Sequence, residues 1–340
     1  MRRYKTAIVG ATGAVGREMM KTLEQRAFPV GELALFASPR IEGRTLEFRG
    51  TKVPVRPLEA SALGGIEVAF FSAGGAVSKE FAPLFAAEGA LVVDNSSAFR
   101  QDRNIPLVIP ELNGIEVVGR TGIVANPNCS TVQLVMAVAP LQRLWGLRQL
   151  FVATYQSVSG TGGRAMQELE QQTRSLMDGG TPERSVYPHQ IAFNLFPQIG
   201  EFGEDGLNIE ERKVVYETRR FLEDDALEVN VTTVRVPVFR CHSEAVVAVT
   251  KEKTSASEVK QALRSAPGVR LVDGQDAASY VTPVLAEGRD EVFVGRVRDA
   301  YPEGHGIAMW VVSDNLRKGA ALNAVQIAEV ALGLSPVHAF

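Results

Sequence analysis

The sequence predicts an α/β protein of two domains: an N-terminal doubly wound parallel sheet and an α+β domain with a mostly antiparallel sheet. Up to about residue 125, short apolar runs alternate with helical patterns, which is typical of a parallel sheet covered on both faces. After about residue 147, strand-like runs predominate and often alternate apolar with polar residues, which favours an antiparallel sheet with helices on one face. A length of 340 residues is sufficient for two such cores.

The first domain is placed at residues 1–128. A long Ala-rich helix over 316–332 is expected to return to it, so that residues 316–340 complete the domain. Its expected strands are 6–9, 33–37, 67–71, 90–93 and 122–125, and its expected helices are 15–26 and 78–88.

The second domain is placed at residues 129–315. Its expected strands are 147–156, 228–236, 245–250, 291–297 and 306–312, and its expected helices are 164–177, 211–222 and 255–265.

Composition narrows the class of protein. A hydrophobic content of 45% with 22% charged residues is that of an ordinary soluble globular chain. The net charge of −3 gives no electrostatic reason for binding nucleic acid or a membrane surface. The start runs straight into a strand pattern, without a signal segment, and the longest apolar run, 132–141, is too short to cross a bilayer. The two cysteines, with no CxxC, predict a reducing compartment and no structural zinc, and hence a cytoplasmic protein.

A glycine cluster, Gly10-Ala11-Thr12-Gly13-Ala14-Val15-Gly16, follows the first strand and opens the first helix. Glycine lets the backbone turn sharply and approach a pyrophosphate, which then faces the helix N-terminus. The spacing is GxxGxxG rather than GxGxxG, so the position after a strand and before a helix carries the interpretation. A dinucleotide would be contacted at Gly10, Thr12, Gly13, Ala14 and Val15.

The end of the second predicted strand bears on the choice of dinucleotide. Enzymes that use NAD usually place an acid there to bind the ribose 2′-hydroxyl. This chain has Ser38 and Arg40, with Glu42 only beyond the arginine. Serine and arginine suit a 2′-phosphate, so NADP is favoured over the alternative in which Arg40 is only a solvated surface residue.

Cys129 lies where an Asn/Pro turn gives way to an apolar helical pattern. Ser, Thr and Asn around it are residues typical of helix starts. A thiol there feels the positive end of the helix dipole, which favours the nucleophilic thiolate. The alternative interpretation is a buried, unreactive cysteine.

A second candidate cluster comprises residues 155–163 and 235–244. His242 is the candidate acid/base between two strand patterns, with His305 as its rival. Arg235 and Arg240 both suit a substrate carboxylate, because the planar guanidinium pairs with it through two hydrogen bonds, and their spacing does not separate them.

Taken together, these stretches resemble the aspartate-β-semialdehyde dehydrogenase family over essentially the whole chain. The combination is far more specific than any one motif. It consists of GATGAVG (10–16), DNSSAFR (94–100), PLVIPELN (106–113), NPNCST (126–131), YQSVSGTG (155–162) and RVPVFRCHSEA (235–245).

The resemblance implies roles for individual residues. Cys129 would be the nucleophile, His242 the acid/base, and Gln156 would orient the intermediate. The residue before the histidine varies in the family, so Cys241 is not expected to be catalytic. Substrate binding would fall to Arg235 for the α-carboxylate, to Glu210 and Lys213 for the amine and phosphate, and to Arg100 and Asn128 for the phosphate. Further cofactor contacts would come from Ser72, Gly74, Asn95, Ser159, Gly160 and Asn315.

The resemblance also implies a reaction and its partners. NADPH would reduce L-4-aspartyl phosphate to L-aspartate 4-semialdehyde and inorganic phosphate through a thioacyl enzyme, reversibly. This step belongs to the pathway that leads to lysine, threonine, methionine and isoleucine. A homodimer built through the second domain, sometimes paired into a dimer of dimers, would be the assembly.

Three alternative functions fit the sequence less well. N-acetyl-γ-glutamyl-phosphate reductase runs the same chemistry, but its cysteine typically lies in Gly-Cys-Tyr-Pro-Thr, whereas this chain has Asn128-Cys129-Ser130-Thr131. A catalytically silent dinucleotide-binding sensor would be expected to lack the cysteine or the histidine. A glyceraldehyde-3-phosphate dehydrogenase is disfavoured by the residues after the cysteine and by the absent acid after the second strand.

Overall fold

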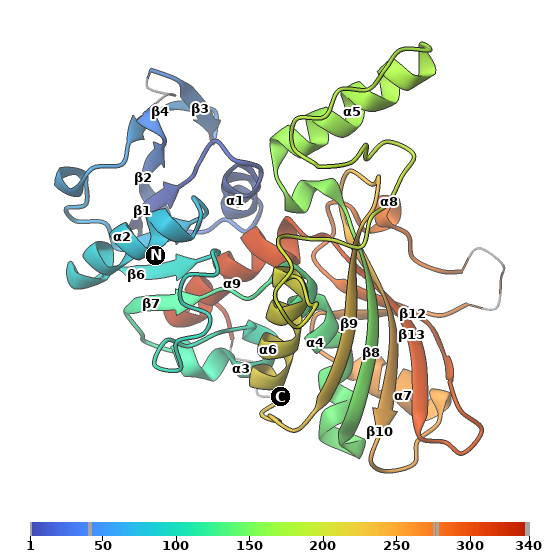
Figure 1. Cartoon of the computed structure of the whole chain (residues 1–340). Helices are drawn as coiled ribbons and strands as arrows, with labels where there is room; N and C mark the ends of the chain where they lie inside the picture. Colours follow the sequence, from blue (N-terminus) through green and yellow to red (C-terminus); the bar gives the residue numbers. More distant parts are fainter. Residues whose placement is uncertain (1, 40–42, 275, 277–278, 337–340) are drawn as a thin grey trace. The chain divides into compact units, whose positions relative to one another are not determined.

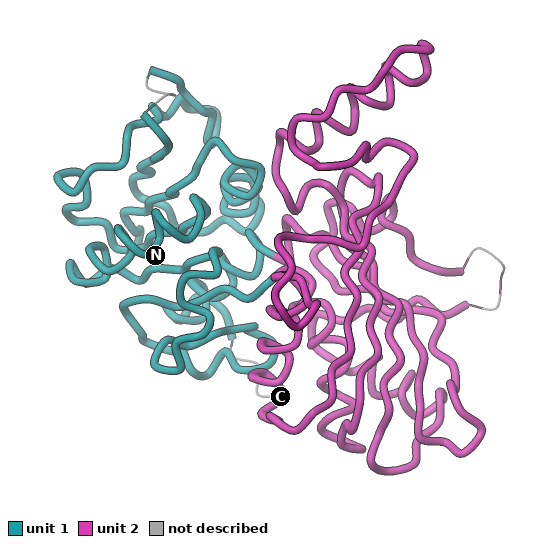
Figure 2. The backbone as a smooth tube through the Cα atoms, in the orientation of Figure 1, with its two compact units in different colours: residues 1–128, 320–340 teal, residues 129–319 magenta. Residues whose placement is uncertain are grey.

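The computed structural model describes residues 2–39, 43–274, 276 and 279–336, and it divides into two compact units (Figures 1 and 2). Unit 1 contains residues 1–128 and 320–340, and unit 2 contains residues 129–319. In the described part of the chain, no helix is both long and apolar enough to cross a bilayer.

Unit 1 is built on a seven-stranded sheet of order β3-β4-β2-β1-β5-β6-β7. The neighbours from β4 to β7 pair in parallel, while β3 pairs antiparallel with β4. The predicted doubly wound parallel sheet is therefore confirmed. The strands are β1 (Tyr4–Val9), β2 (Val30–Ala37), β3 (Thr45–Phe48), β4 (Thr51–Pro57), β5 (Val68–Phe71), β6 (Leu91–Asp94) and β7 (Gly122–Ala125).

Helices cover both faces of this sheet. Met19 and Leu23 of α1 share a core with Ile8 of β1 and with Val325 of α9. On the other face, Phe85 of α2 lies edge-on against a phenylalanine of β5, with 5.3 Å between ring centroids. The helices are α1 (Ala14–Gln25), α2 (Gly75–Ala87), α3 (Pro110–Asn113) and α9 (Leu322–Ala331), with short 3₁₀ segments at Ala60–Ala62 and Gly114–Val117.

The hairpin of β3 and β4 and the C-terminal helix of unit 1 differ from the prediction. The β3–β4 hairpin was not predicted, because its strands carry charged residues. Its turn is made by Arg49 and Gly50, both with positive φ (49° and 74°), which is the geometry of a two-residue hairpin turn. The helix predicted over 316–332 begins as an α-helix only at Leu322, because Arg317–Ala321 (η5) forms a π-helical turn.

Unit 2 contains a six-stranded sheet of order β11-β12-β13-β10-β8-β9. The three inner pairings are antiparallel, and the two edge strands, β11 and β9, pair in parallel with their neighbours. The predicted mostly antiparallel sheet is thus confirmed. The strands are β8 (Leu147–Gln156), β9 (Glu228–Arg235), β10 (His242–Thr250), β11 (Val269–Val272), β12 (Val292–Asp299) and β13 (Gly306–Ser313).

One face of this second sheet is covered by helices α4, α6 and α7. The opposite face leaves Phe151 and Tyr155 of β8 more than a third exposed. Helix α5 stands at the upper end of the sheet in Figure 1 and has a small core of its own. The helices are α4 (Cys129–Trp145), α5 (Gly163–Met177), α6 (Ile209–Phe221), α7 (Ala256–Ser265) and α8 (Pro283–Ala286), with a 3₁₀ turn at Val158–Gly160.

Candidate active site

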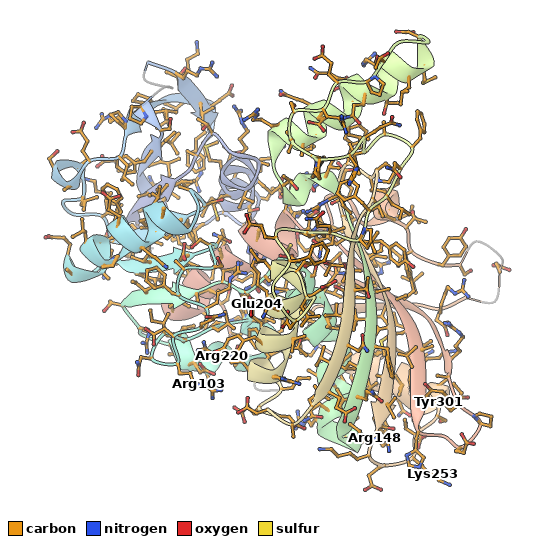
Figure 3. All side chains as sticks on the ribbon, viewed as in Figure 1. Arg103, Arg148, Glu204, Arg220, Lys253 and Tyr301 are labelled. Atoms are coloured by element: carbon orange, nitrogen blue, oxygen red, sulfur yellow. The ribbon has the colours of Figure 1, made fainter. Side chains whose placement is uncertain are left out.

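Four buried polar side chains form a row across one end of the unit 2 sheet. In the register of the strands, Gln156 pairs with Arg235 and His242 pairs with Ser313. Ser243 pairs with Tyr155, so His242 comes next to Gln156. Residues that pair across strands share a face, and this face is the one covered by α4. We call Arg235, Gln156, His242 and Ser313 the polar row; Arg148, at the start of β8, marks the far end of the sheet in Figure 3.

His242 has a defined tautomer. Its Nδ1 accepts a hydrogen bond from the backbone N–H of Ser157 at 3.0 Å, so in the neutral ring the proton resides on Nε2. Burial lowers the pKa of His242 to about 3, with the positive charge of Arg235 acting in the same direction and Glu210 opposing. The Nε2 atom is buried and has no hydrogen-bond partner in the described structure. The ring is therefore a neutral donor whose N–H is available to a bound molecule.

Arg235 is held beside this ring. Its Nη1 donates to the Ser157 carbonyl at 2.6 Å, and its buried Nε has no partner in the described structure. Arg240 is different, because its Nε forms an ion pair with buried Asp314 at 2.8 Å. The guanidinium of Arg240 is therefore already paired with a carboxylate, and Arg235 is the better candidate to bind the carboxylate of a substrate.

The loop after β8 lies close to both groups. A Cβ atom on Gly160 would lie 3.2 Å from His242 Nε2 and 3.3 Å from Arg235 Nη1. Glycine at this position thus keeps the space in front of the imidazole open. His305 is distant from this place, since it precedes β13 whereas His242 pairs with the last residue of that strand.

Asn315 fixes the loop rather than facing an open space. Its Oδ1 accepts hydrogen bonds from the hydroxyls of Ser157 (3.2 Å) and Ser159 (3.0 Å) and from the backbone N–H of Cys241 (3.0 Å). The side chain therefore ties the segment after β8 to the segment before β10, and a cofactor contact of Asn315 remains a prediction.

Cys129 is the first residue of α4, where the helix dipole favours its thiolate. The residue is partly exposed, whereas Cys241 is fully buried and burial raises the pKa of the Cys241 thiol. One turn later, Gln133 accepts a hydrogen bond from Ser313 of the polar row at 2.8 Å. Because residues four apart share a helix face, α4 presents Cys129 on the side that packs against the polar row.

Glu210 and Lys213 lie on the first turns of α6 and form an ion pair at 3.1 Å. The start of α6 is fixed by a capping box between Asn208 and Glu211. Glu211 also accepts the backbone N–H of Thr233 at 2.9 Å, two residues before Arg235. The sequence that caps this helix therefore also anchors it to strand β9.

The glycine cluster of unit 1 lies at the carboxyl end of β1. Gly10 has φ +92°, and a Cβ atom there would lie 2.4 Å from the carbonyl oxygen of Ser72, which follows β5. A Cβ atom on Gly16 would lie 2.3 Å from the Gly10 carbonyl oxygen. Strands β1 and β5 flank the point where the strand order reverses, which is where open α/β sheets bind ligands.

Two helices begin at this edge without a side-chain cap. The N-cap of α1 is Gly13, and the N-cap of α2 is Gly74, with φ 89°. Thr12 directly precedes Gly13, and Ala14 and Val15 are the first two residues of α1. Uncapped N-terminal N–H groups favour an anion such as a pyrophosphate. Near them, the side-chain oxygen of Asn95, just after β6, is buried and has no hydrogen-bond partner in the described structure.

Arg100 is buried in unit 1. Its guanidinium donates to the carbonyl oxygens of Asn126 (2.9 Å) and Asn95 (2.8 Å), which follow β7 and β6. Asn128 is also buried and directly precedes Cys129 in the chain. Ser38 is exposed just after β2, whereas Arg40 lies outside the described residues.

Sequence reasoning missed two residues of unit 2. A Cβ atom on Gly319, within the π-helical turn, would lie 2.8 Å from the Cβ of Cys129. Glu244 lies two residues after His242, on the same face, and is fully buried with neither carboxyl oxygen hydrogen-bonded in the described structure. Burial raises the pKa of Glu244 well above its usual value, against an opposing effect of Gln133. In the sequence, the available signals were a glycine within a helical pattern for Gly319 and an acidic residue next to a strand pattern for Glu244.

Comparison with known families matches both parts of the chain. Residues 5–124 match the family model described as semialdehyde dehydrogenase, NAD binding domain. Residues 138–318 match the model described as semialdehyde dehydrogenase, dimerisation domain.

Similar proteins cover almost the whole chain. The aspartate-semialdehyde dehydrogenase of Aquifex aeolicus is 49% identical over 331 residues, which cover 96% of this chain and 97% of that protein. The enzyme of the same name from Bacillus subtilis is 43% identical over 336 residues, covering 96% and 97%. The crystal structure of aspartate semialdehyde dehydrogenase II from Vibrio cholerae, complexed with ASA, has a TM-score of 0.93 and 45% identity, covering 97% of this chain and 98% of that one.

Proposed function

The chain belongs to the aspartate-semialdehyde dehydrogenase family, and we propose that it forms L-aspartate 4-semialdehyde from L-4-aspartyl phosphate through a thioacyl intermediate on Cys129. The enzyme is an oxidoreductase of amino-acid biosynthesis with a nicotinamide dinucleotide cofactor. The observation that carries the proposal is that α4, which begins with the Cys129 thiol, packs against the polar row. That row holds a neutral imidazole and an arginine whose Nε has no partner among the described residues.

NADP is the proposed form of the cofactor. Ser38, exposed after β2, and Arg40 support it, since the position carries no acid to bind a ribose 2′-hydroxyl. The uncapped starts of α1 and α2 suit the pyrophosphate, and the unpartnered oxygen of Asn95 suits a donor on the cofactor. Ser72 and Gly74 lie at the same edge, and Ser159, Gly160 and Asn315 are retained as contacts from unit 2. When bound, NADPH supplies a hydride.

In the biosynthetic direction, the Cys129 thiolate attacks the acyl carbon of the substrate, and the carbon–oxygen bond to phosphate breaks. The acyl group is then bound to sulfur as a thioester, and hydride addition followed by cleavage of the carbon–sulfur bond releases the aldehyde. A free cysteine is only a few per cent thiolate at pH 7. The N-terminus of α4 supports the ionised form.

His242 enters this scheme as a donor at Nε2. Accepting the thiol proton at that atom would need the other tautomer, with the proton on Nδ1, and would produce the imidazolium. Both species carry a proton on Nδ1, which conflicts with the Ser157 N–H that points at that atom. A neutral Nε2–H instead stabilises the oxygen on which negative charge develops during attack and hydride addition. Gln156, next to His242 in the polar row, is assigned to orienting the acyl group.

The remaining binding roles follow the charges of the substrate. Arg235 is assigned to the α-carboxylate, because its Nε has no partner in the part of the chain that the structure describes and a guanidinium matches a carboxylate. Glu210 is assigned to the amine, and the phosphate is assigned to Lys213, Arg100 and Asn128. Inorganic phosphate is the co-substrate of the reverse direction.

We propose a homodimer as the assembly, formed through the exposed face of the unit 2 sheet. The match to a dimerisation domain and the exposure of Phe151 and Tyr155 on that face support it. Pairing into a dimer of dimers is a further arrangement that size-exclusion chromatography with light scattering separates from the dimer. We propose a cytoplasmic location, because the sequence has only two cysteines and no CxxC motif.

The test is NADPH formation by the purified protein with L-aspartate 4-semialdehyde, with and without phosphate, next to Cys129→Ser. We expect turnover that needs phosphate and disappears in the variant. Turnover with NAD equal to that with NADP would contradict the cofactor assignment. Absence of turnover together with intact NADPH binding would contradict the proposed reaction; N-acetylglutamyl semialdehyde is then the substrate to try.

A further inference from the structure

Arg235 is held by more than the strand that carries it. Its backbone exchanges two hydrogen bonds with Phe196, at 3.1 and 2.9 Å. Its guanidinium carbon lies 6.0 Å from the centre of the Tyr187 ring, within the range of a cation–π contact. Both aromatic residues come from the segment that follows α5.

The position of the Tyr187 ring is fixed at both ends. Its hydroxyl donates a hydrogen bond to Thr161 Oγ1 at 2.8 Å. Its ring meets Phe196 edge-on, with 5.4 Å between centroids. Val158, Leu169 and Ile191 form the small core beneath it. Tyr187 therefore spans from the loop after β8 to the strand that carries Arg235.

One carboxylate on α5 organises the backbone at Tyr187. Glu168, which is buried, accepts the backbone N–H groups of Ser185 (2.9 Å), Val186 (2.5 Å) and Tyr187 (3.4 Å), as well as the Ser185 hydroxyl (2.8 Å). Burial by itself would raise the pKa of Glu168, but these donors outweigh it and lower the pKa. The carboxylate is therefore ionised at neutral pH.

A second buried side chain, one turn along α5, repeats this arrangement. Gln172 donates to the Glu183 carbonyl at 2.8 Å and to Glu168 at 3.1 Å. Its own carbonyl oxygen accepts the N–H groups of Ile191 and Ala192, at 2.9 and 3.1 Å. Fully paired buried networks of this kind fix one conformation of the chain they bind. Residues 183–192 are thus attached to α5 from both ends.

We propose that Tyr187, attached to α5 through Glu168 and Gln172, is a positioning residue that sets the plane of the Arg235 guanidinium and thereby the enzyme's preference for a substrate with an α-carboxylate. This inference rests on the proposed role of Arg235. Ser157 occupies Nη1, and the Tyr187 ring restricts rotation of the guanidinium plane, so the Nε side is the part left for a carboxylate. Bidentate pairing depends on that plane, which a single point charge would not require.

The main experiment compares Tyr187→Leu with Tyr187→Phe. Leucine removes the ring, whereas phenylalanine keeps it and removes only the bond to Thr161; Thr161→Val removes the same bond from the other side. We expect Tyr187→Leu to raise KM for L-aspartate 4-semialdehyde about tenfold, with kcat and KM for phosphate changed less than about twofold. Tyr187→Phe and Thr161→Val should each raise that KM about twofold, because a single exposed hydrogen bond contributes little. Thermal unfolding of each variant shows whether it is folded.

A substrate without the α-carboxylate provides the discriminating control. For 3-aminopropanal, which keeps the aldehyde and amine, Tyr187→Leu should leave KM unchanged. An equal rise of KM for both aldehydes, or an unchanged KM for the natural one, would overturn the proposal.

Arg235→Lys separates this proposal from the one it rests on. If Tyr187 acts through Arg235, adding Tyr187→Leu to Arg235→Lys should raise KM by much less than it does in the wild type. A raised KM in Arg235→Lys with no effect of Tyr187→Leu alone would contradict the role of Tyr187 only. An unchanged KM in Arg235→Lys would remove the carboxylate assignment itself, and the Tyr187 proposal with it.

Discussion

The two units build their candidate sites from different materials. In unit 1 the site is mostly backbone: a left-handed Gly10, two helix starts without side-chain caps, and a turn that a Cβ atom would obstruct. In unit 2 it is mostly buried side chains, aligned by strand register, of which His242 and Arg235 each retain a donor without a partner among the described residues. The site in unit 1 depends on glycines at positions where a side chain would obstruct the backbone. The site in unit 2 depends on the pairing of strands, which brings its polar side chains together. Substitutions should therefore affect the two units in different ways.

The largest effect is expected at His242. His242→Ala should lower kcat about a thousandfold, because an oxyanion donor is removed, while His242→Gln should lower it only about tenfold, because the amide N–H can replace Nε2–H. Steady-state kinetics of both variants measure this difference. Equal losses in the two variants would show that the imidazole acts as a base, which glutamine cannot do.

The next largest effect is expected at Gly319 of unit 2, where the absence of a side chain leaves room for Cys129. Gly319→Ala places a Cβ atom 2.8 Å from that of Cys129, so the nucleophile must move, and kcat should fall about a hundredfold. Gly114→Ala is the matched control, because its Cβ atom would meet neighbours only at 3.7 Å or more. Rates of Cys129 alkylation by iodoacetamide should fall in the first variant alone; unchanged alkylation and turnover would contradict the close packing.

In unit 1, Gly10→Ala should weaken NADPH binding about tenfold and leave the folded state of unit 2 intact. The reason is both the positive φ and the 2.4 Å approach to the Ser72 carbonyl oxygen. Fluorescence titration of NADPH gives the Kd. Gly89→Ala, at φ +88° with open space around its Cβ position, separates backbone strain from obstruction. If both variants bind NADPH like the wild type, Gly10 does not shape the cofactor site.

The smallest effect is expected from Glu244→Gln. The pKa of this carboxyl is higher in the folded state than in the unfolded chain. The stability that the protonated carboxyl contributes is therefore complete at a pH below the pKa of the unfolded chain, and it is lost as the pH rises through the pKa of the folded state. A neutral glutamine avoids that loss, so the variant should be more stable than the wild type at pH 8, on the order of 1 kcal/mol. At pH 5 the gain should vanish. Urea unfolding at both pH values measures it, and a variant that is less stable at pH 8 would refute the protonated state of Glu244.

The sequence predicted the parts of the fold that depend on local pattern. The parallel sheet of unit 1 follows from short apolar runs that alternate with helical patterns, and the antiparallel centre of the second sheet follows from strands that alternate apolar with polar residues; both are confirmed. Strand β10 was predicted to start at residue 245 but starts at His242, because its first residues are polar and are buried by partners on neighbouring strands rather than by their own apolarity.

The geometry of the candidate site depended on long-range contacts that no local pattern reveals. The contact of Gly319 with Cys129 joins residues from opposite ends of unit 2, and it arises in a π-helical turn within what looked like one continuous helix. The tautomer of His242 depends on a backbone N–H of another strand's loop. The choice between Arg235 and Arg240 also depended on a long-range contact, because Asp314, 74 residues further along the chain, forms an ion pair with Arg240.

The thioacyl intermediate on Cys129 is the central claim and can be tested by mass spectrometry. The protein is incubated with L-aspartate 4-semialdehyde and NADP without phosphate, quenched in acid, and analysed intact and after proteolysis. We predict a mass increase of one aspartyl group, located on the peptide that contains Cys129, that is lost when phosphate is added. NADPH formation without such an adduct, or with the adduct on another residue, would contradict the account.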